Sequence, residues 1–434
     1  MEHARVNIQS LAHGGDGVAR LDDGRTLFVP GTCPGDDVTI EVTASHDRWA
    51  RGVMRTLHVP SPDRVEPECP YFGACGGCQW QHISYERQIE AKRDTLVESL
   101  RRIGRVAAPG VEPVAPSSAA YGYRNKIELS AGTGSRGPVF GFMRAGSADI
   151  LPIDSCHLLP GRARRSPKAL AGALRFVASR GALDIQRAAL RVSSAGEVSV
   201  DLWTGPGPFP RAAVARVVAE STGAATVTRI IFRGALERRD VSQVEVLMGR
   251  GAWSETLDDD CYLVSAPSFF QVNTLGAMEL RARALELLAI NGTMRVADLY
   301  AGAGTFTLPL ARAAGDVVAV EGSRYALSDL RRNLEHAGLS ADIVPGDAAH
   351  ALPDLGHLDA ALIDPPRSGL ADSAMRALVD ARIERIVYVS CDPATLARDV
   401  NRLISAGYEA KRFVPVDLFP QTYHLETIAL LELG

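Results

Sequence analysis

The feature that most constrains the fold is an alternation of short apolar runs and amphipathic stretches from Arg295 to the end of the chain. Helical periodicity fills several of the gaps between the runs, for example at 327–337. Apolar strands that alternate with helices are typical of a mostly parallel sheet covered on both faces. We therefore predict an α/β domain with strands at 295–300, 316–321, 341–345, 358–364, 385–390, 410–416 and 425–433.

The first 60 residues show a different pattern, with about five short alternating runs separated by glycine-rich turns such as 13–17. Strands of this length and spacing favour a small β-barrel of the oligonucleotide-binding type. Prolines between 60 and 67 mark a linker after it. Between 115 and 260, strand-like runs mix with an arginine-rich helical stretch, which favours a central α+β domain.

Charge and hydropathy limit the partners of the chain. The net charge is −4, but the stretch 161–191 carries eight basic residues against one acid. Such a stretch suits a phosphate backbone and equally suits a solvated arginine-rich helix. No apolar run reaches the roughly 20 residues of a membrane-spanning helix, and the first ten residues have no apolar signal core. We expect a cytoplasmic protein that does not associate with membranes.

A glycine-rich turn follows the first predicted strand of the α/β domain, at 300–306. Its two glycines allow the backbone to turn sharply and to approach a ligand closely. Glu321 ends the next strand, 23 residues after Asp298, where an acid can accept both ribose hydroxyls. Asp347 follows the third strand, where it can meet an adenine amino group. The turn has no lysine for a triphosphate, so we predict a different nucleoside cofactor.

A cysteine and two carboxylates follow or begin other strands of this domain. Cys391 ends the fifth predicted strand just before a helix, where open α/β sheets bind ligands. A helix N-terminus lowers the pKa of a thiol, which favours a nucleophile over a buried structural cysteine. Asp364 ends the fourth strand, and Glu426 lies near the start of the last. A thiolate beside a carboxylate base is typical of covalent catalysis.

These motifs resemble a known family. Ser-Cys-Asp-Pro-Ala-Thr-Leu-Ala-Arg-Asp at 390–399, Ser-Phe-Phe-Gln-Val-Asn at 268–273 and Phe-Pro-x-Thr-x-His-Leu-Glu before Thr427 are similar to RNA uracil-5-methyltransferases. The resemblance implies a class I S-adenosylmethionine-dependent enzyme in which Cys391 adds to carbon 6 of uracil. It implies that Glu426 removes the carbon 5 proton. The cofactor-binding residues that it implies are Gln271, Tyr300, Thr305, Glu321, Asp347 and Asp364.

Cysteine usage indicates a metal site. The chain has seven cysteines, an odd number that argues against a disulfide framework. Four of them could hold a [4Fe-4S] cluster or a zinc ion, and the Cys75-Gly-Gly-Cys78 pair could also be a redox dithiol. The three-plus-one spacing favours iron-sulfur, and the segment 75–83 resembles the iron-sulfur branch of the family, which largely modifies ribosomal RNA. The expected ligands are Cys69, Cys75, Cys78 and Cys156.

We therefore predict a multidomain protein that uses S-adenosylmethionine and a [4Fe-4S] cluster. The expected parts are a TRAM-like RNA-binding barrel at 1–60, a cluster-bearing RNA-binding α+β domain at 61–90 and 115–265, and a Rossmann-like methyltransferase domain at 91–114 and 266–434. The predicted product is 5-methyluridine in large-subunit ribosomal RNA, made by a monomer. The alternatives are the same chemistry on transfer RNA and a non-catalytic RNA-binding iron-sulfur assembly factor.

Overall fold

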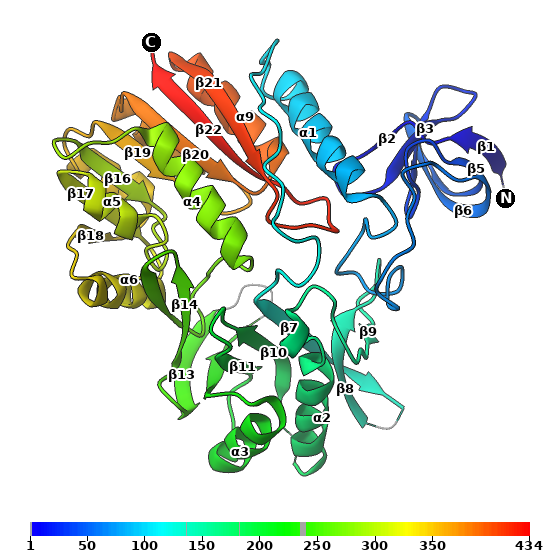
Figure 1. The fold of residues 1–434 in the computed structure, drawn as a ribbon, viewed down its shortest axis with the longest axis horizontal. Helices are drawn as coiled ribbons and strands as arrows, with labels where there is room; N and C mark the ends of the chain where they lie inside the picture. Colours follow the sequence, from blue (N-terminus) through cyan, green and yellow to red (C-terminus); the bar gives the residue numbers. More distant parts are fainter. Residues whose placement is uncertain (1, 136, 182, 235–239) are drawn as a thin grey trace.

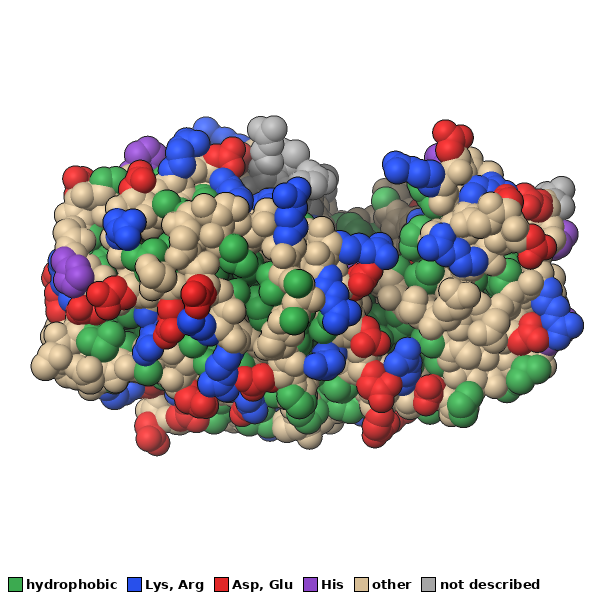
Figure 2. All heavy atoms as spheres, turned by 90° about the horizontal axis from the view of Figure 1, so that it is seen from above, with side chains coloured by type: hydrophobic (Ala, Val, Ile, Leu, Met, Phe, Trp, Pro, Cys, Tyr) green, Lys and Arg blue, Asp and Glu red, His purple; other side chains and the backbone are tan. Residues whose placement is uncertain are grey.

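The computed structural model describes residues 2–135, 137–181, 183–234 and 240–434. Three β-sheets divide the molecule: the N-terminal sheet and the C-terminal sheet lie at opposite ends, and the central sheet lies between and below them in Figure 1. Seen from above, a hollow separates the N-terminal part from the rest of the molecule (Figure 2). Within the described ranges, the chain forms no helix that is long and apolar enough to cross a membrane.

The N-terminal sheet curls around a small apolar core. Its strand order is β1-β5-β6-β4-β3-β2, and β1 also contacts β3, which is not its neighbour in this order. Alternate residues of β4 are buried, as the two-residue period of a strand requires. The predicted run at 6–11 is divided between two strands, because Ile8 exchanges backbone hydrogen bonds with residues 35 and 36 instead. The strands are β1 (His3–Asn7), β2 (Ser10–Leu11), β3 (Gly17–Arg20), β4 (Thr26–Val29), β5 (Asp37–Ser45) and β6 (Trp49–Val59).

Helix α1 (Tyr85–Arg102) connects this sheet to the C-terminal domain, as the helical period at 83–103 predicted. The Ser84 hydroxyl caps it by accepting a hydrogen bond from the Arg87 amide at 3.4 Å. Leu96 and Leu100 are fully buried in the core of the C-terminal domain. The N-terminal helix therefore folds together with the far end of the chain.

The central domain is a seven-stranded sheet with helices α2 and α3 on one face (Figure 1). Its strand order is β13-β12-β11-β10-β7-β8-β9, and only β11 and β12 run parallel among these pairs. The arginine-rich stretch is only partly helical: α2 carries Lys168 and the exposed Arg175, whereas Arg187 and the buried Arg191 lie in β10. A hairpin of β14 and β15 leads on to the C-terminal domain. The elements are β7 (Lys126–Gly134), β8 (Gly137–Met143), β9 (Ile150–Leu151), a 3-10 turn (Gly161–Ala163), α2 (Ser166–Ser179), β10 (Ile185–Val192), β11 (Val198–Thr204), α3 (Arg211–Thr222), β12 (Thr226–Phe232), β13 (Val241–Met248), β14 (Ala252–Leu257) and β15 (Asp260–Ser265).

The C-terminal domain contains every strand predicted for it, in a sheet of order β18-β17-β16-β19-β20-β22-β21. The first five strands in this order run parallel, and their buried sequences are covered by helices on both faces. The elements are α4 (Thr274–Leu288), β16 (Arg295–Leu299), α5 (Thr307–Ala313), β17 (Asp316–Glu321), α6 (Arg324–Ala337), β18 (Asp342–Pro345), α7 (Ala348–Ala351), a 3-10 turn (Leu352–Asp354), β19 (Ala360–Ile363), α8 (Asp372–Asp380), β20 (Arg385–Ser390), α9 (Pro393–Ser405), β21 (Tyr408–Val416) and β22 (Glu426–Leu433).

The last strand creates the geometry of the site. β22 is inserted between β20 and β21 and runs antiparallel to both. Its first residues therefore lie beside the last residues of β20, with Ser390 opposite Thr427. The carboxyl ends of the parallel strands and the beginning of β22 meet at one edge of the sheet.

Candidate active site

The glycine-rich turn after β16 places main-chain atoms at the edge of the sheet where the parallel strands end. Tyr300, Gly302 and Gly304 have φ angles of +67°, +58° and +97°, in the left-handed region that favours glycine. A Cβ atom at Gly304 would lie 2.8 Å from side-chain carbons of Leu308 and Leu330, so a larger residue would clash there. The turn can therefore lie close to a ligand only because its glycines carry no side chains.

Two acids support this turn. The carboxylate of Glu321 accepts hydrogen bonds from the amides of Gly302 at 2.8 Å and Ser323 at 2.6 Å. Asp298 is fully buried and accepts from the Thr307 hydroxyl at 2.5 Å, while its other oxygen has no partner among the described residues. Burial raises the pKa of Asp298 to about 7. The acid predicted to bind ribose thus lies directly at the glycine-rich turn.

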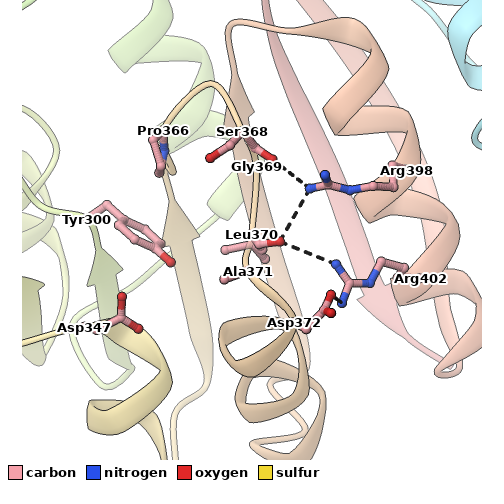
Figure 3. A pocket seen from close by; sticks show the side chains of 10 residues that line it. All are labelled: Tyr300, Asp347, Pro366, Ser368, Gly369, Leu370, Ala371, Asp372, Arg398 and Arg402. Carbon is pink, nitrogen blue, oxygen red and sulfur yellow. Dashed lines mark hydrogen bonds and ion pairs between the residues drawn. The ribbon is translucent and has the colours of Figure 1, made fainter. Parts of the chain in front are cut away.

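A cavity of about 610 Å³ opens beside the turn. Tyr300 and Asp347 line one side, and the loop between β19 and α8 lines the other (Figure 3). Arg398 and Arg402 of α9 hold this loop: Arg398 donates to the Ser368 carbonyl at 2.9 Å, and Arg402 donates to the Leu370 carbonyl at 3.4 Å. The cavity joins two of the residues predicted to bind the cofactor.

The other four predicted cofactor residues, Gln271, Thr305, Glu321 and Asp364, do not line this cavity. Gln271 is buried in the loop between β15 and α4, where its carbonyl accepts a hydrogen bond from the Asn125 side chain at 3.0 Å. Thr305 follows the glycine-rich turn, and its carbonyl accepts from the Tyr262 hydroxyl at 3.4 Å. Gln271 and Thr305 are thus held through their backbones, which leaves their side chains available.

Cys391 lies between the end of β20 and the start of α9. Burial raises the pKa of its thiol to about 12, and the carboxyl groups of Glu426 and Asp364 add to this, while the Arg367 guanidinium opposes it. The expectation that the helix N-terminus lowers this pKa is therefore wrong. Desolvation and two neighbouring acids outweigh the helix dipole and one cation. The resting thiol is protonated at neutral pH.

Glu426 begins β22 and is 4% exposed. Burial raises its pKa to about 8, with a further contribution from the Asp364 carboxyl, and Arg367 again opposes the shift. Burial, together with Asp298, raises the pKa of Asp364 itself to about 7. Three buried acids therefore share one edge of the sheet, and their mutual repulsion would be relieved by a positively charged ligand.

Two residues near the thiol were missed by the sequence reasoning. The Arg367 guanidinium lies 2.9 Å from Nδ1 of His424, and its positive charge opposes the rise in the pKa of the Cys391 thiol. Burial lowers the pKa of His424 to about 4, so the neutral ring accepts from the guanidinium. Arg367 ends the Asp-Pro-Pro-Arg motif and His424 precedes Glu426 by two positions. The motifs therefore contained both residues, but gave no sign that they meet.

The four cysteines expected to bind a metal lie near one another, but the described residues show no metal centre. Burial raises the pKa of the Cys78 thiol to about 12, and the other three cysteines add to the shift, so the four thiols lie close enough to interact. However, in the part of the chain that the structure describes, no group of three or more His, Cys, Asp or Glu side chains could hold a metal ion. Buried thiols without a cation stay protonated and have no charge to draw them together. The expected ligand set of Cys69, Cys75, Cys78 and Cys156 is therefore not shown.

Known proteins match nearly the whole chain. The TRAM domain family matches residues 2–54, the methyltransferase small domain family matches 281–384, and the tRNA (uracil-5-)-methyltransferase family matches 354–433. An uncharacterized RNA methyltransferase of Gloeobacter violaceus is 37% identical over 98% of this chain and 96% of its own length. A second, from Halalkalibacterium halodurans, is 34% identical over 99% of this chain and 96% of its own length.

A solved structure has the same overall fold. The tRNA (uracil-54, C5)-methyltransferase of Pyrococcus abyssi, in complex with S-adenosyl-L-homocysteine, aligns with a TM-score of 0.78 and 28% identity. The alignment covers 98% of this chain and 99% of that one. The N-terminal TRAM domain and the methyltransferase fold that we predicted are thereby confirmed. The chain is a member of the S-adenosylmethionine-dependent RNA uracil-5-methyltransferase family.

Proposed function

We propose that this protein forms 5-methyluridine in ribosomal RNA through a covalent adduct between Cys391 and the uracil ring. The observation that carries the proposal is the pairing of β20 with β22. This pairing brings the half-buried Cys391 thiol close enough to the buried Glu426 carboxyl for the carboxyl to help raise the pKa of the thiol.

The two side chains supply the chemistry that uracil requires. Carbon 5 of uracil is a poor nucleophile, and addition of the Cys391 thiolate to carbon 6 turns the ring into an enolate that can be alkylated at carbon 5. S-adenosylmethionine, when bound, supplies the methyl group. Glu426 in its ionised form then removes the proton from carbon 5, and the carbon–sulfur bond breaks to release Cys391 and the product.

The resting charges explain why an unliganded site would be inactive. The thiol and Glu426 are both protonated at neutral pH, because burial and neighbouring acids raise both pKa values. The positive charge of Arg367 favours the thiolate form of Cys391. A bound sulfonium cation near Asp364 and Glu426 would lower the pKa of both acids. Cofactor binding thus prepares the base.

The cofactor residues proposed from the resemblance fit the local chemistry. Glu321 offers a carboxylate at the glycine-rich turn, as two ribose hydroxyls require. Tyr300 and Asp347 line the cavity and offer an aromatic ring and an acceptor to an adenine base. Asp364 lies next to the reacting groups. We assign Gln271 and Thr305 to the same site from the resemblance.

RNA is the substrate class that the domains support. The TRAM-like region at 1–60 and the central domain at 61–90 and 115–265 would hold the RNA, and Lys and Arg side chains lie on both rims of the hollow in Figure 2. The target uridine must leave its stack to reach Cys391. Ribosomal RNA is favoured by the resemblance of the segment 75–83, whereas the solved relative is named for transfer RNA.

Mapping of 5-methyluridine in RNA from cells with and without the gene tests both the reaction and the substrate. We expect loss of the modification from large-subunit ribosomal RNA only. Loss from transfer RNA alone would assign the alternative substrate. Release of tritium from [5-³H]uridine RNA by the purified protein tests the chemistry directly, since a non-catalytic RNA-binding assembly factor would release none.

We also propose that the four cysteines hold a [4Fe-4S] cluster in the protein as made in cells. The support is that Cys69, Cys75 and Cys156 each help to raise the pKa of the Cys78 thiol, so the four thiols lie near one another. Thiolates in this number are the ligands that such a cluster takes. Anaerobically purified protein should contain about four irons per chain. One zinc and no iron would overturn the assignment.

A further inference from the structure

The first turn of the N-terminal barrel is pressed against the catalytic domain. The carbonyl of Gly15 accepts a hydrogen bond from the indole nitrogen of Trp80 at 3.0 Å. Gly15 has a φ of +98°, and a Cβ atom there would lie 3.0 Å from a side-chain carbon of Gln79 and 3.3 Å from the ring of Tyr423. Only glycine allows so close an approach. The barrel is thus seated between the loop before α1 and the loop that leads to Glu426.

The same turn places His13 beside the residue that follows Cys391. Its Nε2 atom lies 3.3 Å from a carboxylate oxygen of Asp392. The imidazole also meets the ring of Tyr423 edge-on, with a centroid separation of 5.6 Å. The side chains of His13 and Asp392 are 38% and 24% exposed, so this contact lies at the rim of the active site.

Asp392 fixes the backbone that carries the thiol. One of its oxygens accepts from the amides of Ala394 at 3.0 Å and Thr395 at 2.9 Å, and this caps α9. The other oxygen faces His13. The contact with His13 is the largest cause that holds the pKa of Asp392 well below its usual range. Both oxygens of a fully ionised carboxylate are therefore engaged, and the peptide next to Cys391 has little freedom.

We infer that His13 is a positioning residue for Cys391, through which the docked barrel holds the nucleophile in the orientation that attack on the uracil ring requires. The inference rests on the proposed function. It makes the barrel part of the catalytic apparatus as well as an RNA-binding module.

Steady-state kinetics of three full-length variants test this inference. His13→Ala should lower kcat about 10- to 100-fold, since displacement of a reacting group by about 1 Å can cost about 10²-fold. The KM for RNA should change by less than about twofold. His13→Gln, whose amide can still donate to Asp392, should recover most of the loss. His357→Ala is the matched control: it breaks another histidine–aspartate pair, at 3.1 Å from Asp359 on the methyltransferase domain, and should leave kcat unchanged.

The kinetic results either support or overturn the positioning role of His13. An effect of His13→Ala on KM alone, or a Gln variant as slow as the Ala variant, would overturn the positioning role. If His13→Ala does not fold, Asp392→Asn probes the contact from its other side and should lower kcat without affecting the KM for RNA. A wild-type protein that forms no 5-methyluridine refutes the proposed function, whereas an active wild type with an equally active His13→Ala refutes only the present inference.

Discussion

Replacement of Glu426 by glutamine should lower the activity of the protein and raise its stability. The amide keeps the size of the side chain, and Glu426 is 4% exposed, so little packing is lost. It cannot accept the carbon 5 proton. Attack by Cys391 and methyl transfer do not require a base at this position, but release of the product does. We therefore expect an enzyme that stalls after methylation and is more stable than the wild type.

The stability gain follows from the pKa of the buried acid. In the unfolded chain the carboxyl is ionised at pH 7, because its ordinary pKa is 4.5, whereas the folded protein raises the pKa of Glu426 to about 8. Its contribution to stability is complete below pH 4.5 and is lost as the pH rises towards 8. At pH 7 the loss is about 3 kcal/mol, since one pKa unit corresponds to about 1.4 kcal/mol. Glu426→Gln should raise the free energy of unfolding by about this amount at pH 7, and by less than about 1 kcal/mol at pH 5.

The stalled state is detected as a protein–RNA adduct. Loss of a general base typically lowers a rate by about 10²- to 10⁴-fold, which corresponds to an increase of roughly 3 to 5 kcal/mol in the activation barrier of the elimination step. The adduct should survive denaturing electrophoresis and carry label from methyl-labelled cofactor. It should vanish in the Cys391→Ala, Glu426→Gln double variant. Glu432→Gln, on the same strand but paired with Arg385 at 2.7 Å, is the matched control and should turn over normally.

Three results would refute this reasoning. Normal turnover by Glu426→Gln would show that another group accepts the proton. Absence of an adduct in a variant that still binds RNA and cofactor would show that Glu426 acts earlier, before the thiolate attacks. An unchanged free energy of unfolding at pH 7 would mean that the carboxyl is not buried in the protonated form.

Three further predictions follow from the same geometry. Cys391→Ala should abolish turnover and adduct formation with less than about a twofold change in cofactor affinity, measured by calorimetry, because a neutral thiol contributes little to binding a cation. Where elimination limits the rate, the initial rate should rise by about tenfold between pH 7 and pH 9, because a pKa of about 8 leaves Glu426 mostly protonated at pH 7 and mostly ionised at pH 9; a flat profile would contradict this assignment. Lys92→Met should lower the free energy of unfolding by about 3 to 5 kcal/mol in denaturant titrations, because it leaves Asp417, its buried partner at 2.6 Å, without a counter-charge; adding Asp417→Asn should recover part of the loss.

Much of the architecture was readable from the chain because it depends on local pattern. The apolar runs that became β16 and β20 are buried on both faces, so their composition alone indicates a covered parallel strand. The glycines of the turn at 300–306 indicate a close approach of backbone to ligand, and the structure holds that turn at the sheet edge. Strand and turn signals extend over only a few residues, and neighbouring residues in the sequence carry them.

The cysteine loop shows what such reasoning left open, and the thiol shows where it failed. Four cysteines at suggestive spacings do not reveal whether their sulfur atoms close around a metal, and the described residues show no metal-binding group. The position of Cys391 before a helix predicted a lowered thiol pKa, but burial and two acids raise it. Desolvation depends on everything packed around a group, and a sequence pattern does not contain that information.

Only the tertiary structure decided which groups act on one another. The sequence determined that a cysteine follows one strand and that a glutamate begins another, while the insertion of β22 beside β20 brought them together. The same long-range packing brings Arg367 into contact with His424, and His13 into contact with Asp392. Periodicity and turn chemistry act along the chain, but charge and hydrogen bonding act through space, so the electrostatics of this site exist only once the barrel and both ends of the chain have come together.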